Sequence, residues 1–262
     1  MRLYQVDAFA DKPFTGNPAA VLRTTAPLTD RLMLDIAIEN NLSETAYLVP
    51  RADGSHELRW FTPGGEVDLC GHATLASAHV LATDYQLDDP YVFHTKSGIL
   101  TVSRSTDNTY LMDLPADKPE AVTSRTAVEE ALGIPVLSLY RGSDDYLAVL
   151  ESAEAVTQCT PDQRRVAALQ QRGLIITARG TETDFVSRCF YPAYAIDEDP
   201  VTGSAHTVLT PYWSMRLRKN VLSAYQASPR GGYLQCIYKG ARVAIIGKAH
   251  TYLRGDITIS MP

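Results

Sequence analysis

The chain has 262 residues, of which 45% are hydrophobic and 21% charged, so it can bury a core and wholesale disorder is excluded. Its 30 acidic and 24 basic side chains give a formal net charge of −6. This balance argues against nucleic acid or an anionic membrane as the partner and favours a small-molecule ligand.

Cysteine spacing and hydropathy indicate the compartment. The four cysteines lack any CxxC spacing, which fits neither a disulfide scaffold nor a structural zinc site. The N-terminus carries Asp7 with no apolar run behind it, unlike a signal peptide, and no stretch is apolar enough to span a bilayer. We therefore expect a cytoplasmic protein.

In chain order, alternating apolar and polar residues predict short strands at 3–9, 57–61, 99–103, 146–150 and 185–190. Capping signals predict helices that start at Thr29, Thr126 and Thr160 and end at Asn40, Gly133 and Gly173. Several strands separate successive helices, so strict βαβ alternation fails. The expected fold class is α+β with mixed or antiparallel sheets.

An internal repeat refines this expectation. Arg59-Trp60-Phe61-Thr62-Pro63 precedes Cys70-Gly71-His72-Ala73, just as Arg188-Cys189-Phe190-Tyr191-Pro192 precedes Thr202-Gly203-Ser204-Ala205. The second copy is three residues longer, and we place the insertion around Asp197-Glu198-Asp199. Both copies run from a strand into an apolar helix, 73–81 and 205–217, that is hydrophobic on more than one face and therefore central.

The repeat predicts two pseudo-symmetric lobes, each a barrel-like sheet around a central helix. The polar, proline-punctuated segment 114–120 is the best linker candidate, which gives an N-terminal lobe of residues 1–115 and a C-terminal lobe of residues 116–262. The final strand is a candidate to return to the N-terminal lobe. The two helix starts are expected to face one cleft.

Gly71 and Gly203 lie where helix N-termini are expected, and unpaired backbone N–H groups with the helix dipole can bind a carboxylate there. The alternative is that both glycines only serve a tight strand-to-helix turn.

Three titratable residues lie beside these helix starts: Glu44, His72 and Asp199. Glu44 heads an apolar strand, where desolvation would suit it to accept and return a proton. An arbitrary glutamate more often faces water. Asp199 before Pro200 can equally be a turn residue, and His72 either a proton relay or a satisfied polar residue.

Cys70 suggests a different chemistry, because a helix start lowers the pKa of a thiol. A thiol-based racemase needs a second thiol in the other lobe, and the matching residue is Thr202. Same-face proton transfer by a carboxylate is therefore preferred. The six histidines are dispersed, which gives no support to a metal site, and no GxGxxG or Walker pattern occurs.

The motifs together resemble one family. Phe14-Thr15-Gly16-Asn17-Pro18, Ser43-Glu44-Thr45-Ala46, Leu69-Cys70-Gly71-His72-Ala73 and Asp199-Pro200-Val201-Thr202-Gly203-Ser204 appear in the order found in the PhzF-like phenazine-biosynthesis family. The resemblance implies a diaminopimelate-epimerase-like fold of two similar lobes with a cleft between them, and a homodimer.

The resemblance also implies an activity: isomerisation of trans-2,3-dihydro-3-hydroxyanthranilate, a small carboxylic acid, without a metal or organic cofactor. It assigns catalytic roles to Glu44, His72 and Asp199. By the same resemblance, the substrate is contacted by Asn17, Cys70, Gly71, Gly203 and Ser204. Two alternatives stay open: a Cys70-dependent amino-acid epimerase or racemase, and a non-catalytic metabolite-binding protein on the same fold.

Overall fold

The computed structural model describes residues 1–105 and 108–259. Contacts divide the chain into two compact units, Met1–Asp113 with the segment from Ile246 onward, and Leu114–Ile245. The predicted boundary after residue 115 lies two residues from this division. Within the described residues, no helix is long and apolar enough to cross a membrane.

The strands of the first unit form a closed ring. Neighbouring strands pair in the order β1, β2, β3, β4, β6, β7, β8 and β17, and β17 pairs with β1 again. The pairs β2–β3 and β4–β6 are parallel, and β5 adds to β4. The strands are β1 (Arg2–Ala8), β2 (Asn17–Arg23), β3 (Glu44–Pro50), β4 (His56–Thr62), β5 (Gly65–Val67), β6 (Tyr91–Thr95), β7 (Gly98–Arg104), β8 (Thr109–Pro115) and β17 (Arg242–Asp256).

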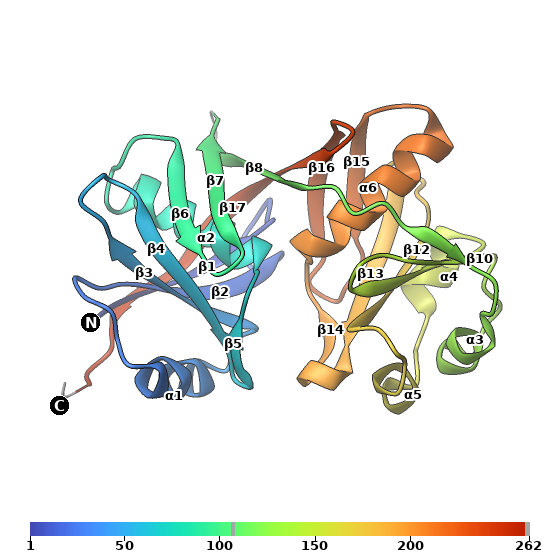
Figure 1. The fold of residues 1–262 in the computed structure, drawn as a ribbon, viewed down its shortest axis with the longest axis horizontal. Coiled ribbons are helices and arrows are strands. Elements are labelled where there is room, and N and C mark those ends of the chain that lie inside the picture. Colours follow the sequence, from blue (N-terminus) through green and yellow to red (C-terminus); the bar gives the residue numbers. More distant parts are fainter. Residues whose placement is uncertain (106–107, 260–262) are drawn as a thin grey trace. The chain divides into compact units, whose positions relative to one another are not determined.

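Helix α2 (Gly71–Thr83) is the core of this unit (Figure 1). Every residue from Gly71 to Ala82 is buried, and the helix packs against β1, β2, β3 and β7. The prediction of a central helix without a polar face is therefore confirmed for 73–81. Helix α1 (Asp30–Asn40) lies outside the strands and buries Met33, Ile36 and Ala37 against them.

The second unit repeats this order of pairings. Its pairs are β9–β10, β10–β11, β11–β12, β12–β13, β13–β15 and β15–β16, and again the pair after the first hairpin, β11–β12, and the pair β13–β15 are parallel. The strands are β9 (Glu120–Val122), β10 (Ser138–Arg141), β11 (Asp145–Val149), β12 (Gly173–Arg179), β13 (Phe185–Tyr191), β14 (Ile196–Asp199), β15 (Val221–Gln226) and β16 (Gly232–Tyr238).

Helix α6 (Gly203–Leu217) is the corresponding core helix, packed against β11, β15 and β16. Pro211 inside it cannot donate a hydrogen bond to the carbonyl of Thr207 four residues earlier. The backbone N–H of Asp117 donates to that carbonyl instead, at 3.1 Å. The start of the second unit thus replaces the helical bond that proline removes.

Side chains preserve the repeat as well. Arg59 forms a bidentate ion pair with Glu66 and stacks on Phe61 at 5.2 Å, and Arg188 does the same with Glu198 and Phe190 at 5.1 Å. Since Glu66 and Glu198 both lie five residues before the first helical glycine, the extra residues cannot lie at 197–199. The three extra residues lie between Tyr191 and Asp197, in the segment that holds the turn η1 (Pro192–Tyr194), so the predicted place of the insertion was wrong.

The strand predictions are confirmed to within a residue or two by β1, β4, β7, β11 and β13. Thr29 caps α1 by accepting from the N–H of Leu32, as predicted. Helix α3 (Thr126–Leu132) ends at Gly133 in the left-handed region, but Thr126 is its first residue rather than its cap.

The predicted helix from Thr160 to Gly173 was wrong. Helix α4 (Ala153–Gln158) ends before it, and α5 (Gln163–Ala167) starts later than expected, with Asp162 as its cap, and ends well before Gly173. Asp162 accepts from the N–H groups of Arg164 and Arg165 and outcompetes Thr160. Gly173 does not stop a helix: it is the first residue of β12.

Candidate active site

The start of α2 places His72 beside Glu44, the first residue of β3. His72 Nε2 and Glu44 Oε2 lie 3.1 Å apart, in ion-pair contact, and neither atom has a hydrogen-bond partner among the described residues. The side chain of His72 is 4% exposed and that of Glu44 12% exposed, so the pair is largely shielded from water. A carboxylate and an imidazole at this distance have the chemistry for proton transfer.

The other ring nitrogen of His72 fixes the imidazole plane. Nδ1 lies 3.2 Å from Asn17 Nδ2 and 3.4 Å from Cys70 Sγ. Asn17 is held there by Gly16, which has a φ of +70° and approaches so closely that a Cβ would lie 2.2 Å from the carbonyl oxygen of Ala8. Four predicted site residues, Asn17, Glu44, Cys70 and His72, therefore form one cluster, with Gly71 as the first helical residue.

Burial and contacts within the cluster shift the pKa values of His72 and Cys70. Burial opposes the imidazolium of His72, but its contacts with Cys70 and Glu44 outweigh this, and the pKa of His72 is raised well above 6.5. Burial, reinforced by the charge of Glu44, raises the pKa of Cys70 to about 11. The expected lowering by the helix start is thus overturned, because desolvation of a thiolate costs more than the helix dipole returns.

The second unit gathers the other predicted residues at the start of α6. Asp199 is buried, and its Oδ2 accepts the hydroxyl of Thr202 at 2.5 Å. Gln226 locks this turn by donating to the carbonyl of Asp199 at 2.8 Å and accepting the N–H of Thr202 at 2.9 Å. Gly203 and Ser204 are the first two helical residues. The turn thus presents backbone N–H groups and one hydroxyl.

Gly173 occupies the place in the second unit that Glu44 occupies in the first. The residue after Glu44 pairs with Phe61, and the residue after Gly173 pairs with Phe190. A Cβ at Gly173 would lie 2.2 Å from the ring of Tyr191. The second unit therefore has no room for a matching carboxylate.

A charged pair that the sequence motifs did not reveal lies next to Gly173. Arg172 donates two hydrogen bonds to Asp145, from Nε at 3.0 Å and from Nη2 at 2.5 Å. Asp145 is only 1% exposed, and Tyr191 stacks 5.3 Å from the guanidinium. Only the parallel pairing of β11 with β12 brings these residues together across 27 positions; the sequence offers no more than the acidic pair Asp144-Asp145 as a signal.

The cluster in the first unit also contains ligand types that metals use. One atom each from Glu44, Cys70 and His72 lie within 4.8 Å of one another. Histidine spacing, on which the expectation of no metal site was based, cannot detect such a set. Binding an ion would require the loss of the thiol proton and of the proton on His72, whose pKa values are both raised, so the cluster favours protons.

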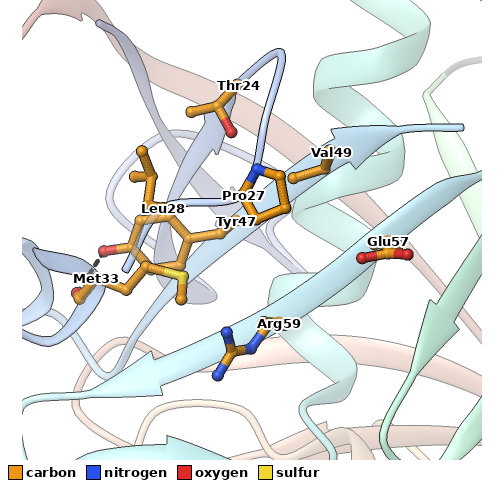
Figure 2. A pocket seen from close by; sticks show the side chains of 8 residues that line it. All are labelled: Thr24, Pro27, Leu28, Met33, Tyr47, Val49, Glu57 and Arg59. Carbon is orange, nitrogen blue, oxygen red and sulfur yellow. Dashed lines mark hydrogen bonds between the residues drawn. The ribbon is translucent and has the colours of Figure 1, made fainter. Parts of the chain in front are cut away.

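A pocket elsewhere in the first unit contains none of the predicted site residues. Figure 2 shows the hydroxyl of Tyr47 directed at the carbonyl of Met33, to which it donates at 2.6 Å. Arg59 at its edge is already bound to Asp30 and Glu66. The polar groups of Tyr47 and Arg59 in this pocket are thus already bound to other residues of the first unit. The lining residues are Thr24, Pro27, Leu28, Met33, Tyr47, Val49, Glu57 and Arg59.

Known proteins share this fold and sequence. An uncharacterized isomerase of Pseudomonas aeruginosa is 50% identical over 99% of both chains. A PhzF family structure from Enterococcus faecalis is 46% identical, covers 98% of this chain and 99% of its own, and superposes with a TM-score of 0.94.

A hydroxyproline epimerase structure from Agrobacterium vitis has a TM-score of 0.66 over 97% of this chain and 91% of its own, at 9% identity, and so shares the fold alone. The predicted epimerase-like α+β fold is confirmed by these structures. The family model described as phenazine biosynthesis-like protein matches residues 6–255, and the chain belongs to this PhzC-PhzF family.

Proposed function

We propose that the protein is a cofactor-independent isomerase that moves a proton on a small unsaturated or cyclic carboxylic acid, in the manner of trans-2,3-dihydro-3-hydroxyanthranilate isomerase. The names of its close relatives, which are uncharacterized isomerases, support the reaction class. The substrate and the mechanism are inferred from the residues of the cluster.

In the proposed step, the carboxylate of Glu44 removes a proton from a carbon conjugated with the substrate carboxylic acid. The C–H bond breaks, the O–H bond forms, and the electron pair moves into the conjugated system. Glu44 then returns the proton, part of which exchanges with solvent, to another carbon on the same face. His72, 3.1 Å from Glu44, would stabilise the charge of the carboxylate before the first transfer and after the second.

The residues proposed to hold the substrate are those that the resemblance assigns. The N–H groups at Gly203 and Ser204 would bind its carboxylate and stabilise the charge that spreads onto it. Asp199 would assist, with its carboxyl oriented by Thr202. Asn17, Cys70 and Gly71 would also contact the substrate.

The absence of a second base at Gly173 is the observation that carries the proposal. A racemase that inverts a stereocentre needs a base on each face, and Gly173 and Thr202 occupy the positions that correspond to Glu44 and Cys70. The Cys70 thiol, with its pKa raised to about 11, is also a poor base at neutral pH. One carboxylate that works on one face fits these residues better.

The test is Glu44→Gln, assayed with trans-2,3-dihydro-3-hydroxyanthranilate in deuterium oxide. We expect turnover and deuterium exchange to fall by about 10² to 10⁴-fold, the usual contribution of a general base. The matched control is Glu66→Gln, a carboxylate of the same unit bound to Arg59 and Lys96, which should retain exchange. Full activity of Glu44→Gln would contradict the proposal.

The two alternatives predict different outcomes. Deuterium incorporation with inversion at a stereocentre, abolished by Cys70→Ser, would favour an epimerase. Binding of carboxylic acids without proton exchange in the wild-type protein would favour a metabolite-binding protein.

A further inference from the structure

Arg172, which the resemblance does not assign, reaches the proposed carboxylate-binding turn. Its Nη2 donates to Ser204 Oγ at 3.4 Å, from the residue just before Gly173. The side chain of Arg172 is 31% exposed, and Ser204 is half-buried at the second position of α6. In the second unit a cation thus precedes Gly173, the residue that corresponds to Glu44 of the first unit.

Asp145 and Tyr191 hold this guanidinium in one orientation. Two hydrogen bonds to Asp145 fix its plane, and the ring of Tyr191 lies against it at 5.3 Å. A buried ion pair contributes little to stability compared with apolar packing, because both charges must be desolvated. Such a pair next to a binding turn therefore suggests a role in positioning.

The hydrogen bond decides which way the Ser204 hydroxyl points. A hydroxyl has one proton and two lone pairs, and a guanidinium can only donate. The Oγ atom must therefore accept from Arg172 and direct its own proton elsewhere, and none of the described residues accepts that proton. The hydroxyl is preset as a donor beside the first N–H groups of α6.

We propose that Arg172 is a positioning residue that acts through Ser204, so that the site selects substrates with a carboxylate over their neutral analogues. This rests on the proposed function, which places the substrate carboxylate at Gly203 and Ser204. Without Arg172, the hydroxyl could rotate and accept instead of donating. The loss would appear in binding rather than in proton transfer, because Glu44 and His72 belong to the other unit.

The experiment compares Arg172→Gln, Ser204→Ala and the double variant. We expect the KM for trans-2,3-dihydro-3-hydroxyanthranilate to rise about tenfold in each single variant, with kcat within about threefold of wild type. The double variant should be no worse than either single variant, because the two residues act as one unit. Arg172→Lys, which keeps a donor, should restore part of the affinity.

The matched control is Arg188→Gln, which breaks another bidentate ion pair of the second unit, with Glu198. The guanidinium of Arg188 contacts the carbonyl of Cys159 and not Ser204. This variant should lower thermal stability and leave KM unchanged. An unchanged KM in Arg172→Gln, or independent and additive effects of the two single variants, would overturn the inference.

A binding assay separates this inference from the proposed function. Benzoate and benzamide are titrated into the wild-type protein and the Arg172→Gln variant by calorimetry. Preference of the wild type for benzoate, lost in the variant, supports the role of Arg172 even if no isomerisation is found. Equal affinity of the variant and the wild type for benzoate would contradict it, whatever the outcome for Glu44→Gln.

Discussion

The turns into α2 and α6 both begin a core helix with a glycine, but different side chains surround them. At α2, Glu44, His72 and Cys70 have titratable atoms within reach of one another. At α6, the neighbouring Arg172 is paired with Asp145, and the place of the carboxylate is taken by Gly173. A duplicated framework therefore separates two tasks: the first unit has groups suited to move a proton and the second has groups suited to hold an anion.

The largest expected effect concerns a histidine inside each core helix. Burial lowers the pKa of His79 in α2 and of His206 in α6 to about 4, from 6.5. A histidine with a depressed pKa binds its proton less readily when folded, so its contribution to stability is present above pH 6.5 and is lost as the pH falls toward 4. Each should account for a loss of about 2–3 kcal/mol.

Denaturant unfolding between pH 7 and pH 4 measures this loss. His206→Asn keeps a polar atom near the carbonyl of Thr202, which His206 Nδ1 contacts at 2.8 Å, and His79→Gln keeps one near Thr251. Each variant should show a flatter decline of stability with falling pH than the wild type. An equally steep decline in both would show that other groups cause the acid sensitivity.

The next effect tests why the second unit has no base. Gly173→Ala places a Cβ against Tyr191 and should lower the free energy of unfolding by about 1–3 kcal/mol, the usual cost of overpacking. Gly64→Ala is the control, since its Cβ would meet only the hydroxyl of Thr62 at 3.5 Å. If Gly173→Ala is as stable as wild type, the site can accommodate a side chain and the difference between the units is not steric.

A smaller effect is expected at His72. His72→Gln keeps a donor near Glu44 but removes the positive charge that stabilises its carboxylate, so turnover should fall about tenfold to a hundredfold, less than in Glu44→Gln. The pH dependence of kcat/KM should lose the ionisation that belongs to His72. A loss as large as that of Glu44→Gln would make His72 itself the base.

The smallest effect should come from Cys70. Cys70→Ser retains a hydrogen-bonding group facing His72 Nδ1, which the sulfur contacts at 3.4 Å, so turnover should fall only about twofold to threefold. Complete loss of turnover with retained folding would assign the chemistry to the thiol and reverse the roles of Glu44 and Cys70.

Local signals were sufficient for part of this structure. Thr29 caps its helix through a contact three residues away, and the repeat of Arg59-Trp60-Phe61 with Arg188-Cys189-Phe190 is visible in the sequence itself. The cluster of Asn17, Glu44, Cys70 and His72 was predicted from motifs. The role of each residue stays a prediction, as does the shared cleft.

Long-range contacts explain what the sequence did not reveal. Gly173 was taken for a helix stop, because the ring of Tyr191 that requires a glycine there is distant in the chain. Asp145 and Arg172 become partners only through strand pairing. The raised pKa of Cys70 depends on complete burial, which the position of a helix start does not disclose.

Strand β17 limits how the two units can be produced separately. The backbone passes between the units twice. The first passage follows Asp113, and the second precedes Ile246 and lies within β17. A protease that cuts only the first passage would divide the chain in two, and the C-terminal fragment, which begins at Leu114, would still belong to both units. Separate production of either half therefore requires two breaks, and the second would divide a β-strand.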